Sequence, residues 1–206
     1  MRYLLYTSAL LMMACKPSSD SSQAQNQPFD SVKHVDTESV KPVPADRLIV
    51  PGKSVGRTVL NDNGAEVVKR LGRPDAGDAA MGKAVSIWYA NHDSTAHQTM
   101  IYTARQMGTS DETARVKQIR ITSPWFTTAD SVRTGVPLQQ IKQHYELTKA
   151  AYYTKGKKQF TLYTTTRGIT FEIDSYSNCS AIIIGEPQDK TGSLYLPFYE
   201  NLQIIK

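Results

Sequence analysis

The chain has 206 residues, of which 40% are hydrophobic, and its 24 basic and 19 acidic residues leave a formal net charge of +5. This length and apolar share suit a single globular domain with a modest core. The positive charge is small and mixed in sign along the chain, so the composition argues against nucleic acid as a partner.

Residues 1–14 are predicted to be a signal peptide. One early positive charge, Arg2, precedes an apolar run that ends at Ala14, and Ala14 supplies the small residue of a cleavage site. The apolar stretch is about a dozen residues long, whereas a membrane-spanning helix needs roughly 20. The tetrapeptide MMAC, which ends at Cys15, resembles the lipobox of bacterial lipoproteins, and this implies lipidation of Cys15. An ordinary secretory signal with an incidental cysteine is the alternative.

Lipidation of Cys15 would anchor the protein to a membrane. Each buried methylene of an acyl chain contributes about 0.8 kcal/mol to membrane binding, so several chains together give a stable anchor. The residue after Cys15 is Lys16 rather than Asp, which resembles the pattern of lipoproteins released toward the outer membrane. We therefore expect an outer-membrane lipoprotein, and whether it faces the periplasm or the cell surface stays open.

Residues 15–46 are predicted to be a flexible tether, and residues 47–206 a folded domain. The tether is rich in Ser, Gln, Asp and Pro and has no helical or strand period, so it cannot bury enough apolar surface to offset its ordering entropy. If Cys15 is acylated, Cys179 has no partner for a disulfide. Its position beside an apolar run indicates a small core residue rather than a nucleophile.

The domain divides into two halves, about 47–122 and 123–206, each with a loop, a short helix and several strand-like segments. The strands are expected at 84–90, 98–104 and 115–122 in the first half, and at 150–154, 158–164, 168–174 and 179–185 in the second. Alternation within them predicts one buried and one solvent face. The residues expected to face solvent are Gln118, Arg120, Thr122, Thr170, Glu172 and Asp174.

The first helix is expected to begin after Asn63, which can cap it, and to end at Gly72. Its apolar face would be Ala65, Val68 and Leu71.

The second helix is expected to have Pro137 in its first turn, followed by the stripe Leu138, Ile141 and Tyr145. Both helices are short and need a sheet to pack on. The predicted class is therefore α+β, with two tandem helix-plus-antiparallel-meander units and the helices packed on one face of an antiparallel sheet.

A spaced pattern in the first half resembles that of a known family. It is the repeat shared by the small outer-membrane lipoproteins of the barrel-assembly machinery and the β-lactamase inhibitor protein, and the resemblance covers about residues 48–174. It implies two repeats in tandem, as in the inhibitor. It leaves the function open, since members of this family include assembly factors, inhibitors and many unassigned lipoproteins. The second unit keeps the Gly135 turn and a helix but departs from the pattern at Tyr145, and residues 78–84 form an unassigned loop. The residues that carry the pattern are Gly52, Lys53, Ser54, Leu71, Gly72, Pro74, Asp75, Trp88 and Tyr89.

No enzyme motif is found in the sequence. It contains no Gly-x-Ser-x-Gly elbow, no His-Glu-x-x-His pair, no phosphate-binding loop and no paired Cys motif. The best metal candidate is the set His92, Asp93 and His97, which could supply nitrogen and oxygen ligands. Such a run between two strands is more typical of a polar turn, so we predict neither a metal, nor a cofactor, nor an enzyme.

Aromatic residues give the strongest indication of a binding surface. The sequence has eleven Tyr, a residue enriched where proteins meet their partners. Packing between neighbouring strands is the alternative explanation. We expect a non-enzymatic protein-interaction module of the cell envelope; an inhibitor or sensor of an envelope or extracellular hydrolase, or a glycan- or peptidoglycan-binding module, are the alternatives. The candidate partner-binding residues are Trp88, Tyr89, Tyr102, Trp125, Phe126 and Tyr163.

Overall fold

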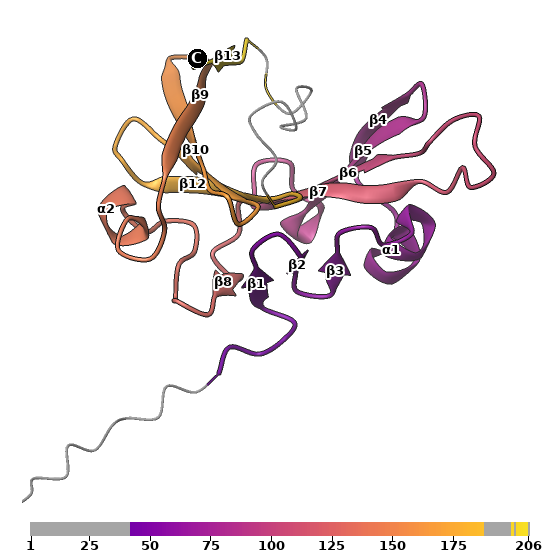
Figure 1. Cartoon of the computed structure of the whole chain (residues 1–206), viewed down its shortest axis with the longest axis horizontal. Helices are drawn as coiled ribbons and strands as arrows, with labels where there is room; N and C mark the ends of the chain where they lie inside the picture. The colour runs from indigo at the N-terminus through magenta and orange to yellow at the C-terminus, as the bar shows by residue number, and fades with distance from the viewer. Residues whose placement is uncertain (1–41, 188–198, 200, 206) are drawn as a thin grey trace, which may run out of the picture. The chain divides into compact units, whose positions relative to one another are not determined.

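A computed structural model describes residues 42–187, 199 and 201–205 (Figure 1). The predicted signal peptide, the lipidation residue Cys15 and the tether up to residue 41 lie outside the described residues. None of the helices in the described part has the length and apolar character needed to cross a membrane.

The predicted α+β class, with tandem units whose helices pack on one face of a sheet, is wrong. About 43% of the residues that the structure describes are in strands and about 10% are helical. Helix α1 (Gly64–Leu71) has eight residues and α2 (Leu138–Ile141) has four, and a helix of one or two turns covers little of a sheet. In Figure 1 the core face of the large sheet is covered mainly by a second, smaller sheet, which lies between the two helices.

In the part of the chain that the structure describes, the large sheet has nine strands, and every neighbouring pair is antiparallel. The first meander is β4 to β7 and the second is β9 to β12; pairing of β7 with β12 joins them, with Arg120 opposite Ile183. The seven predicted strands are confirmed within a few residues at each end. The bounds are β4 Ala76–Ala80, β5 Lys83–Tyr89, β6 Gln98–Ala104, β7 Arg115–Ile121, β9 Thr148–Lys155, β10 Lys158–Thr164, β11 Ile169–Ile173, β12 Cys179–Ile184 and β13 Gln203–Ile204.

Among the described residues, the small sheet has four strands in the order β3-β2-β1-β8. Its strands have only two or three residues, too few to show an alternating pattern, and so the sequence indicated loops here. Parallel pairing of β1 with β8 places Leu48 opposite Thr127, which brings the starts of the two halves together. The bounds are β1 Leu48–Val50, β2 Ser54–Val55, β3 Thr58–Val59 and β8 Thr127–Thr128.

The main core lies between the two sheets. Ile119 and Phe171 project into it from the large sheet, Ile49 from the small sheet, Val67 from α1 and Ile141 from α2. Each of these side chains is at most 1% exposed, and burying one contributes about 1.5–3 kcal/mol. The helices therefore contribute single side chains to a core that strands enclose.

Helix α1 begins and ends as predicted, but it turns a different face to the core. The Asn63 side chain accepts a hydrogen bond from the Ala65 N–H, and Gly72 follows the helix with a φ of 85°. Val67 is the buried residue, whereas Val68 is 36% and Leu71 39% exposed. The expected apolar face is therefore wrong: Val67 points into the core instead, and Leu71 lines a cleft that is described below.

In the second half, the predicted stripe is buried although the helix is short. Helix α2 ends at Ile141, and Pro137 is its N-cap rather than a residue of its first turn. Ile141 and Tyr145 are both buried, and the Tyr145 ring packs edge-on against Phe171 with a centroid distance of 5.1 Å.

The second face of the large sheet is not a solvent face, contrary to expectation. Arg120 and Glu172 are 7% and 2% exposed, and Nη2 of Arg120 lies 3.0 Å from each carboxylate oxygen of Glu172. Ser180 donates a hydrogen bond of 2.8 Å to the same carboxylate. Burial is the largest influence on the pKa of Arg120 and lowers it, but the attraction and hydrogen bonds of Glu172, together with the nearby Tyr199 and Tyr153, raise it by more in total.

Aromatic rings cover this ion pair. Tyr153 of β9 and Tyr199 pack at a centroid distance of 4.6 Å and belong to a second apolar cluster with Leu162 and Ile183. Tyr199 comes after the last strand of the second meander in sequence. Alternation within a strand predicts which residues share a face, but it cannot reveal that a distant segment covers that face.

Residues 78–84, left unassigned from sequence, form the hairpin of β4 and β5. Met81 and Gly82 occupy its two-residue turn with φ values of 50° and 75°, the positive values that a tight hairpin of this kind requires. The β4 strand is therefore an edge of the large sheet.

Candidate functional site

An apolar cleft of about 350 Å³ opens between the two sheets. We call it the intersheet cleft. Ile119 is fully buried and lies deepest, whereas Leu71 at the end of α1 is 39% exposed and borders the mouth. Charged Asp46 and Arg57 are exposed at the mouth. The lining residues are Asp46, Val55, Arg57, Thr58, Leu71, Trp88, Thr99, Ile119 and Phe126.

A glycine sets the position of one wall. Gly56 lies in the turn between β2 and β3 with a φ of 52°, and its N–H donates to the Leu48 carbonyl at 2.9 Å. A Cβ at Gly56 would lie 2.6 Å from the Asp46 carbonyl and 3.2 Å from Cε1 of Phe126. The close approach of this turn to Asp46 and Phe126 therefore requires glycine, and the next residue, Arg57, is fixed at the mouth.

The opposite wall of the cleft is held in place by residues of the sequence pattern that resembles the barrel-assembly lipoproteins. The Trp88 indole N–H donates to the Gly72 carbonyl at 3.0 Å, and the Tyr89 N–H donates to the Asp75 carboxylate at 2.7 Å. The Tyr89 bond, followed by the bond with His92, lowers the pKa of Asp75. These contacts join the end of α1 to β5 and orient the Trp88 ring along the cleft, so the pattern has a structural role here.

Another residue of the pattern, Gly52, serves close backbone packing. Its N–H donates to the Gly168 carbonyl at 3.2 Å. A Cβ at Gly168 would lie 2.4 Å from the Gly185 carbonyl and 2.7 Å from the Gly52 Cα. The glycines at 52 and 168 thus allow the first half to lie directly against the second.

Trp125 and Arg47, which are sequence neighbours of two residues that line the cleft, stack on each other. Trp125 precedes Phe126 and is 55% exposed, and Arg47 follows Asp46. The Arg47 guanidinium carbon lies 4.2 Å from the centroid of the Trp125 ring, and Arg47 Nε donates to the Trp125 carbonyl at 3.2 Å. Two residue types that often dominate binding energy at interfaces are therefore held together at the surface.

The six predicted partner-binding residues do not form one patch. Trp88 and Phe126 line the cleft, and Trp125 adjoins it. Tyr163 of β10 is half-buried against the main core. Consecutive residues of a strand point to opposite faces, so Tyr89 lies on the other face from Trp88.

Tyr102 is on that second face too, opposite Val85 in the pairing of β5 with β6, and it is 9% exposed. Sequence reasoning missed Val55, Leu71 and the two charged residues at the mouth. The signal that could have indicated the β2–β3 hairpin is Gly56, which lies between Ser54-Val55 and Thr58-Val59.

The residues considered for metal binding make other contacts. The His92 ring pairs with Asp75, and the Asp93 carboxylate accepts from the Thr95 N–H and hydroxyl at 2.9 and 2.8 Å. Within the described ranges, no group of three or more His, Cys, Asp or Glu residues could hold a metal ion.

Cys179 is confirmed as a buried residue. Burial raises the pKa of its thiol, which keeps the sulfur protonated and unreactive as a nucleophile.

No model of a known protein family matches the chain, and a search of curated proteins finds no match either. Among solved structures, the chain is similar to an extracellular protein containing an SCP domain from Bacillus anthracis str. Ames, with a TM-score of 0.42 and 9% sequence identity. The match covers 71% of this chain and 49% of the other, about half its length. A likeness this weak carries no argument, so the resemblance to barrel-assembly lipoproteins and the β-lactamase inhibitor protein stays a prediction.

Proposed function

We propose that the protein is an envelope lipoprotein that acts as a non-enzymatic protein-interaction module through the intersheet cleft. The observation that carries this proposal is an apolar recess with aromatic and aliphatic walls and a mouth that bears one acidic and one basic side chain. Its occupant is an apolar side chain from a loop or extended segment of an envelope protein.

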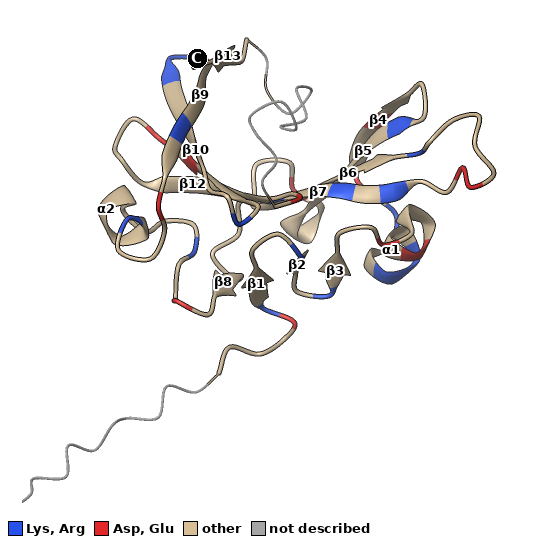
Figure 2. Ribbon diagram, viewed as in Figure 1, with Lys and Arg blue, Asp and Glu red and all other residues tan. Residues whose placement is uncertain are grey.

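The chemistry of the cleft supports a polypeptide partner. Its volume lies near the lower end of the range for ligand sites, which suits one or two large side chains. Charged residues of both signs are mixed over the described elements (Figure 2), and the mouth of the cleft likewise has one of each sign, Asp46 and Arg57. A polypeptide, which carries both signs beside apolar groups, can pair with both.

Anchoring to the outer membrane is part of the same proposal, and it depends on Cys15. Cells grown with labelled palmitate should incorporate the label into the wild-type protein and recover it in the outer-membrane fraction. The Cys15→Ser variant should lose both the label and the fractionation. Equal membrane association of the two proteins, with no label in either, would overturn the anchoring.

The cleft is tested with two variants of helix α1. Leu71 lines the cleft, whereas Val68 does not line it and is exposed to nearly the same extent, 36% against 39%. Leu71→Asp should therefore weaken partner binding strongly, and Val68→Asp serves as the matched control. Losing an anchor of this kind costs about 2 kcal/mol or more, roughly a thirtyfold loss of affinity.

The readout is photo-crosslinking in intact cells, with benzoylphenylalanine in place of Arg57 at the mouth. We expect a crosslink to a defined envelope protein that falls at least tenfold with Leu71→Asp and persists with Val68→Asp. The same probe in place of Tyr176, which is 77% exposed and lies outside the cleft, should not give this product. Equal crosslinking in both α1 variants would refute the cleft as the docking site.

A glycan-binding function is the second candidate, and the exposure of Trp125 favours it because an open indole can stack on a sugar ring. Purified protein incubated with isolated peptidoglycan separates the two functions. Retention that is lost in Trp125→Ala, together with no protein crosslink at the cleft, would favour the glycan.

A further inference from the structure

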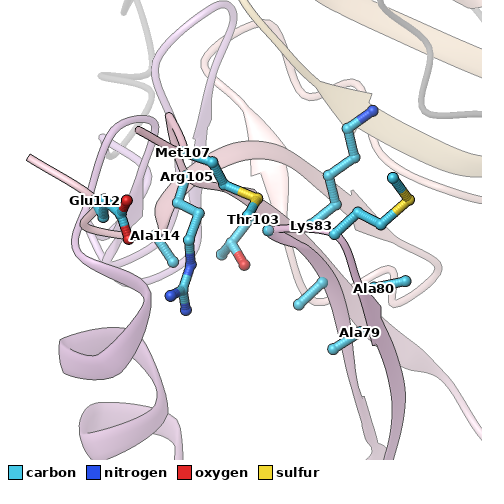
Figure 3. Close-up of a pocket in the computed structure, with 11 residues that line it drawn as sticks. Ala79, Ala80, Lys83, Thr103, Arg105, Met107, Glu112 and Ala114 are labelled. Carbon is cyan, nitrogen blue, oxygen red and sulfur yellow. The ribbon is translucent and has the colours of Figure 1, made fainter. Parts of the chain in front are cut away.

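The two edges of the large sheet differ in what lies against them. At β4, a crease of about 250 Å³ adjoins the tip of the hairpin with β5, and Figure 3 shows small side chains such as Ala79 and Ala80 along it. No strand of the described ranges pairs with the outer side of β4. The outer side of β9, by contrast, carries β13 (Figure 1), so the structure itself shows what kind of segment fits there.

The segment that leads into β13 covers the second face of the large sheet. We call it the strap, and it consists of Tyr199 and residues 201–205. The Tyr199 ring packs at 4.6 Å from Tyr153, and Leu202 packs against the same apolar cluster. Burial, followed by the charge of Glu172, raises the pKa of the Tyr199 phenol. The strap is therefore the cover of the buried ion pair.

Only a short strand holds the strap to the β9 edge. Within the described residues, β13 pairs with β9 at two positions, Gln203 with Tyr152 and Ile204 with Ala151, whereas β10 pairs with the other side of β9 at seven. Both residues of β13 are exposed. Since β9 has eight residues, a longer strand in the same place would gain main-chain hydrogen bonds that β13 does not make.

The surface beneath the strap favours its release. Arg120 and Glu172 are charged and buried there, and taking two charges out of water costs free energy that their mutual attraction does not always repay. An apolar pair of similar volume would carry no such cost. When the strap leaves, the ion pair regains water, and this gain offsets part of the burial that Tyr199 loses. The strap therefore opens more easily than a cover over apolar residues would.

We propose that the strap is releasable and that the surface beneath it is a second polypeptide-binding site, whose occupant is an extended partner segment that pairs with β9 in place of β13. The strap shows the chemistry required: an aromatic residue in the place of Tyr199, with apolar residues three and five positions later, as at Leu202 and Ile204. Strand addition selects an extended segment through its main chain and specifies it through alternate side chains.

A separate partner suits this surface better than a second copy of the chain. The strap of a second copy would make the same two pairs with β9 and bury the same aromatic ring, so exchanging straps would add no contact while it cost the freedom of one molecule. A partner strand that pairs along more of β9 gains hydrogen bonds instead.

A disulfide tests release within one protein. The Ile205 N–H donates to the Ala150 carbonyl at 2.9 Å, so Ala151 and Ile204 form the adjoining, non-hydrogen-bonded pair, in which side chains lie closest. Ala151→Cys with Ile204→Cys should therefore form a disulfide, and we call this double variant the lock. It is made in the full chain with Cys15→Ser, so that no lipid is attached. Oxidation holds the strap shut, and reduction frees it.

The probe is a fluorescent peptide with the sequence of residues 199–205, Tyr-Glu-Asn-Leu-Gln-Ile-Ile, and anisotropy measures its binding. The reduced lock should bind the peptide, and the oxidised lock should not. Tyr199→Ala in the chain removes the aromatic residue of the competing strap, so it should tighten peptide binding about tenfold. The same change within the peptide should weaken binding by a similar factor. A merely structural Tyr199 would not produce these opposite effects.

Gln203→Pro weakens the strap in a second way, because it removes a main-chain donor of β13 and leaves the buried residues unchanged. It should also tighten peptide binding, and it keeps the proposal falsifiable if Tyr199→Ala destabilises the chain. Equal peptide binding by the oxidised and reduced lock, or no binding by either weakened chain, would overturn the proposal. If the reduced lock sediments as a dimer and the oxidised lock as a monomer, the occupant is a second copy, and a separate partner is refuted.

Exchange of the Ile205 amide measures the opening of the strap directly. In the double variant Arg120→Met with Glu172→Leu, the surface beneath the strap is apolar, so the strap should open less often and this amide should exchange about tenfold more slowly. Unchanged or faster exchange would refute the role of the ion pair in release. None of these variants changes a residue that lines the intersheet cleft, so a failure here leaves the crosslinking result at Arg57 unaffected.

Discussion

The two meanders of the large sheet have similar topology but differ in how they are covered. In the second meander, all five residues of β11 and five of the six in β12 are buried, because an apolar layer lies on each face. In the first meander, burial falls from β7 toward the edge until β4 has no buried residue. The second meander thus has a closed centre at β11 and β12, although β9 and β10 keep exposed residues, whereas the first meander opens toward the cleft and the β4 edge.

This difference shows where binding surfaces can arise in a sheet protein of this size. A strand buried on both faces stabilises the fold but offers nothing to a partner. A strand that extends beyond the core contributes little stability and presents its main chain. Substitutions in β11 and β12 should therefore mainly change stability, and those at the cleft should mainly change binding.

The largest effect is expected from breaking the buried ion pair of the second face. Glu172→Leu leaves Arg120 charged and buried without its partner, which should lower the free energy of unfolding by about 3–5 kcal/mol. The double variant Arg120→Met with Glu172→Leu should recover most of this loss, because no charge then remains buried. Urea unfolding of the three proteins measures both values. A single variant as stable as the wild type would show that the second face is not closed.

A smaller loss is expected where the two halves meet through glycine. Gly168→Ala would bring a Cβ within 2.4 Å of the Gly185 carbonyl at a φ of 74°, so we expect a loss of about 2–3 kcal/mol. Gly156→Ala is the matched control, since its φ is 62° and nothing lies within 4 Å of the added Cβ; it should cost about 1 kcal/mol. Equal losses in thermal unfolding would mean that backbone strain, and not close packing, is the cost at Gly168.

In the first meander, Trp88→Phe should have a modest effect. The change keeps an aromatic ring in the cleft and removes the indole bond to the Gly72 carbonyl, which is worth about 1 kcal/mol. Faster amide exchange should be confined to the end of α1 and to β5. Exchange that also accelerates in β11 would contradict the separation of the two halves.

The weakest effect is expected in acid, at Asp75. Its pKa is lowered from 3.8 in the folded protein, first by the Tyr89 N–H and then by His92. The ionised carboxylate therefore stabilises the fold above pH 3.8, and this contribution is lost as the pH falls through the lower folded value. Asp75→Asn should remove the contribution at neutral pH and flatten the acid limb of the stability curve. The same slope in both proteins would exclude the proposed contacts.

The strands were predictable from sequence because their alternation is a local property. Ile169, Phe171 and Ile173 predict β11 and one buried face, and Asn63 and Gly72 predict the ends of α1. The burial of Glu172 was not predictable, since it depends on Tyr199, which lies 27 positions further along the chain. Strands of two residues such as β2 and β3 show no pattern at all.

The candidate site was predictable only in part, for the same reason. Trp88 and Phe126 stood out as aromatic residues, and both line the cleft. Leu71 appeared to belong to a buried helical stripe, and only the packing of α1 shows that it is exposed at the mouth. Tyr102 has the composition of a binding residue but lies in a covered part of the sheet. Residue type identifies candidates, and long-range packing decides which of them reach solvent.

Amide hydrogen exchange, resolved strand by strand in the intact chain, tests the contrast between the two meanders most directly. We predict that the amides of β11 and β12 exchange only through global unfolding, while those of β4 and the adjoining end of β5 exchange through local opening at far lower free energy. Protection of β4 equal to that of β11 would contradict this account, because the first meander would then be as closed as the second.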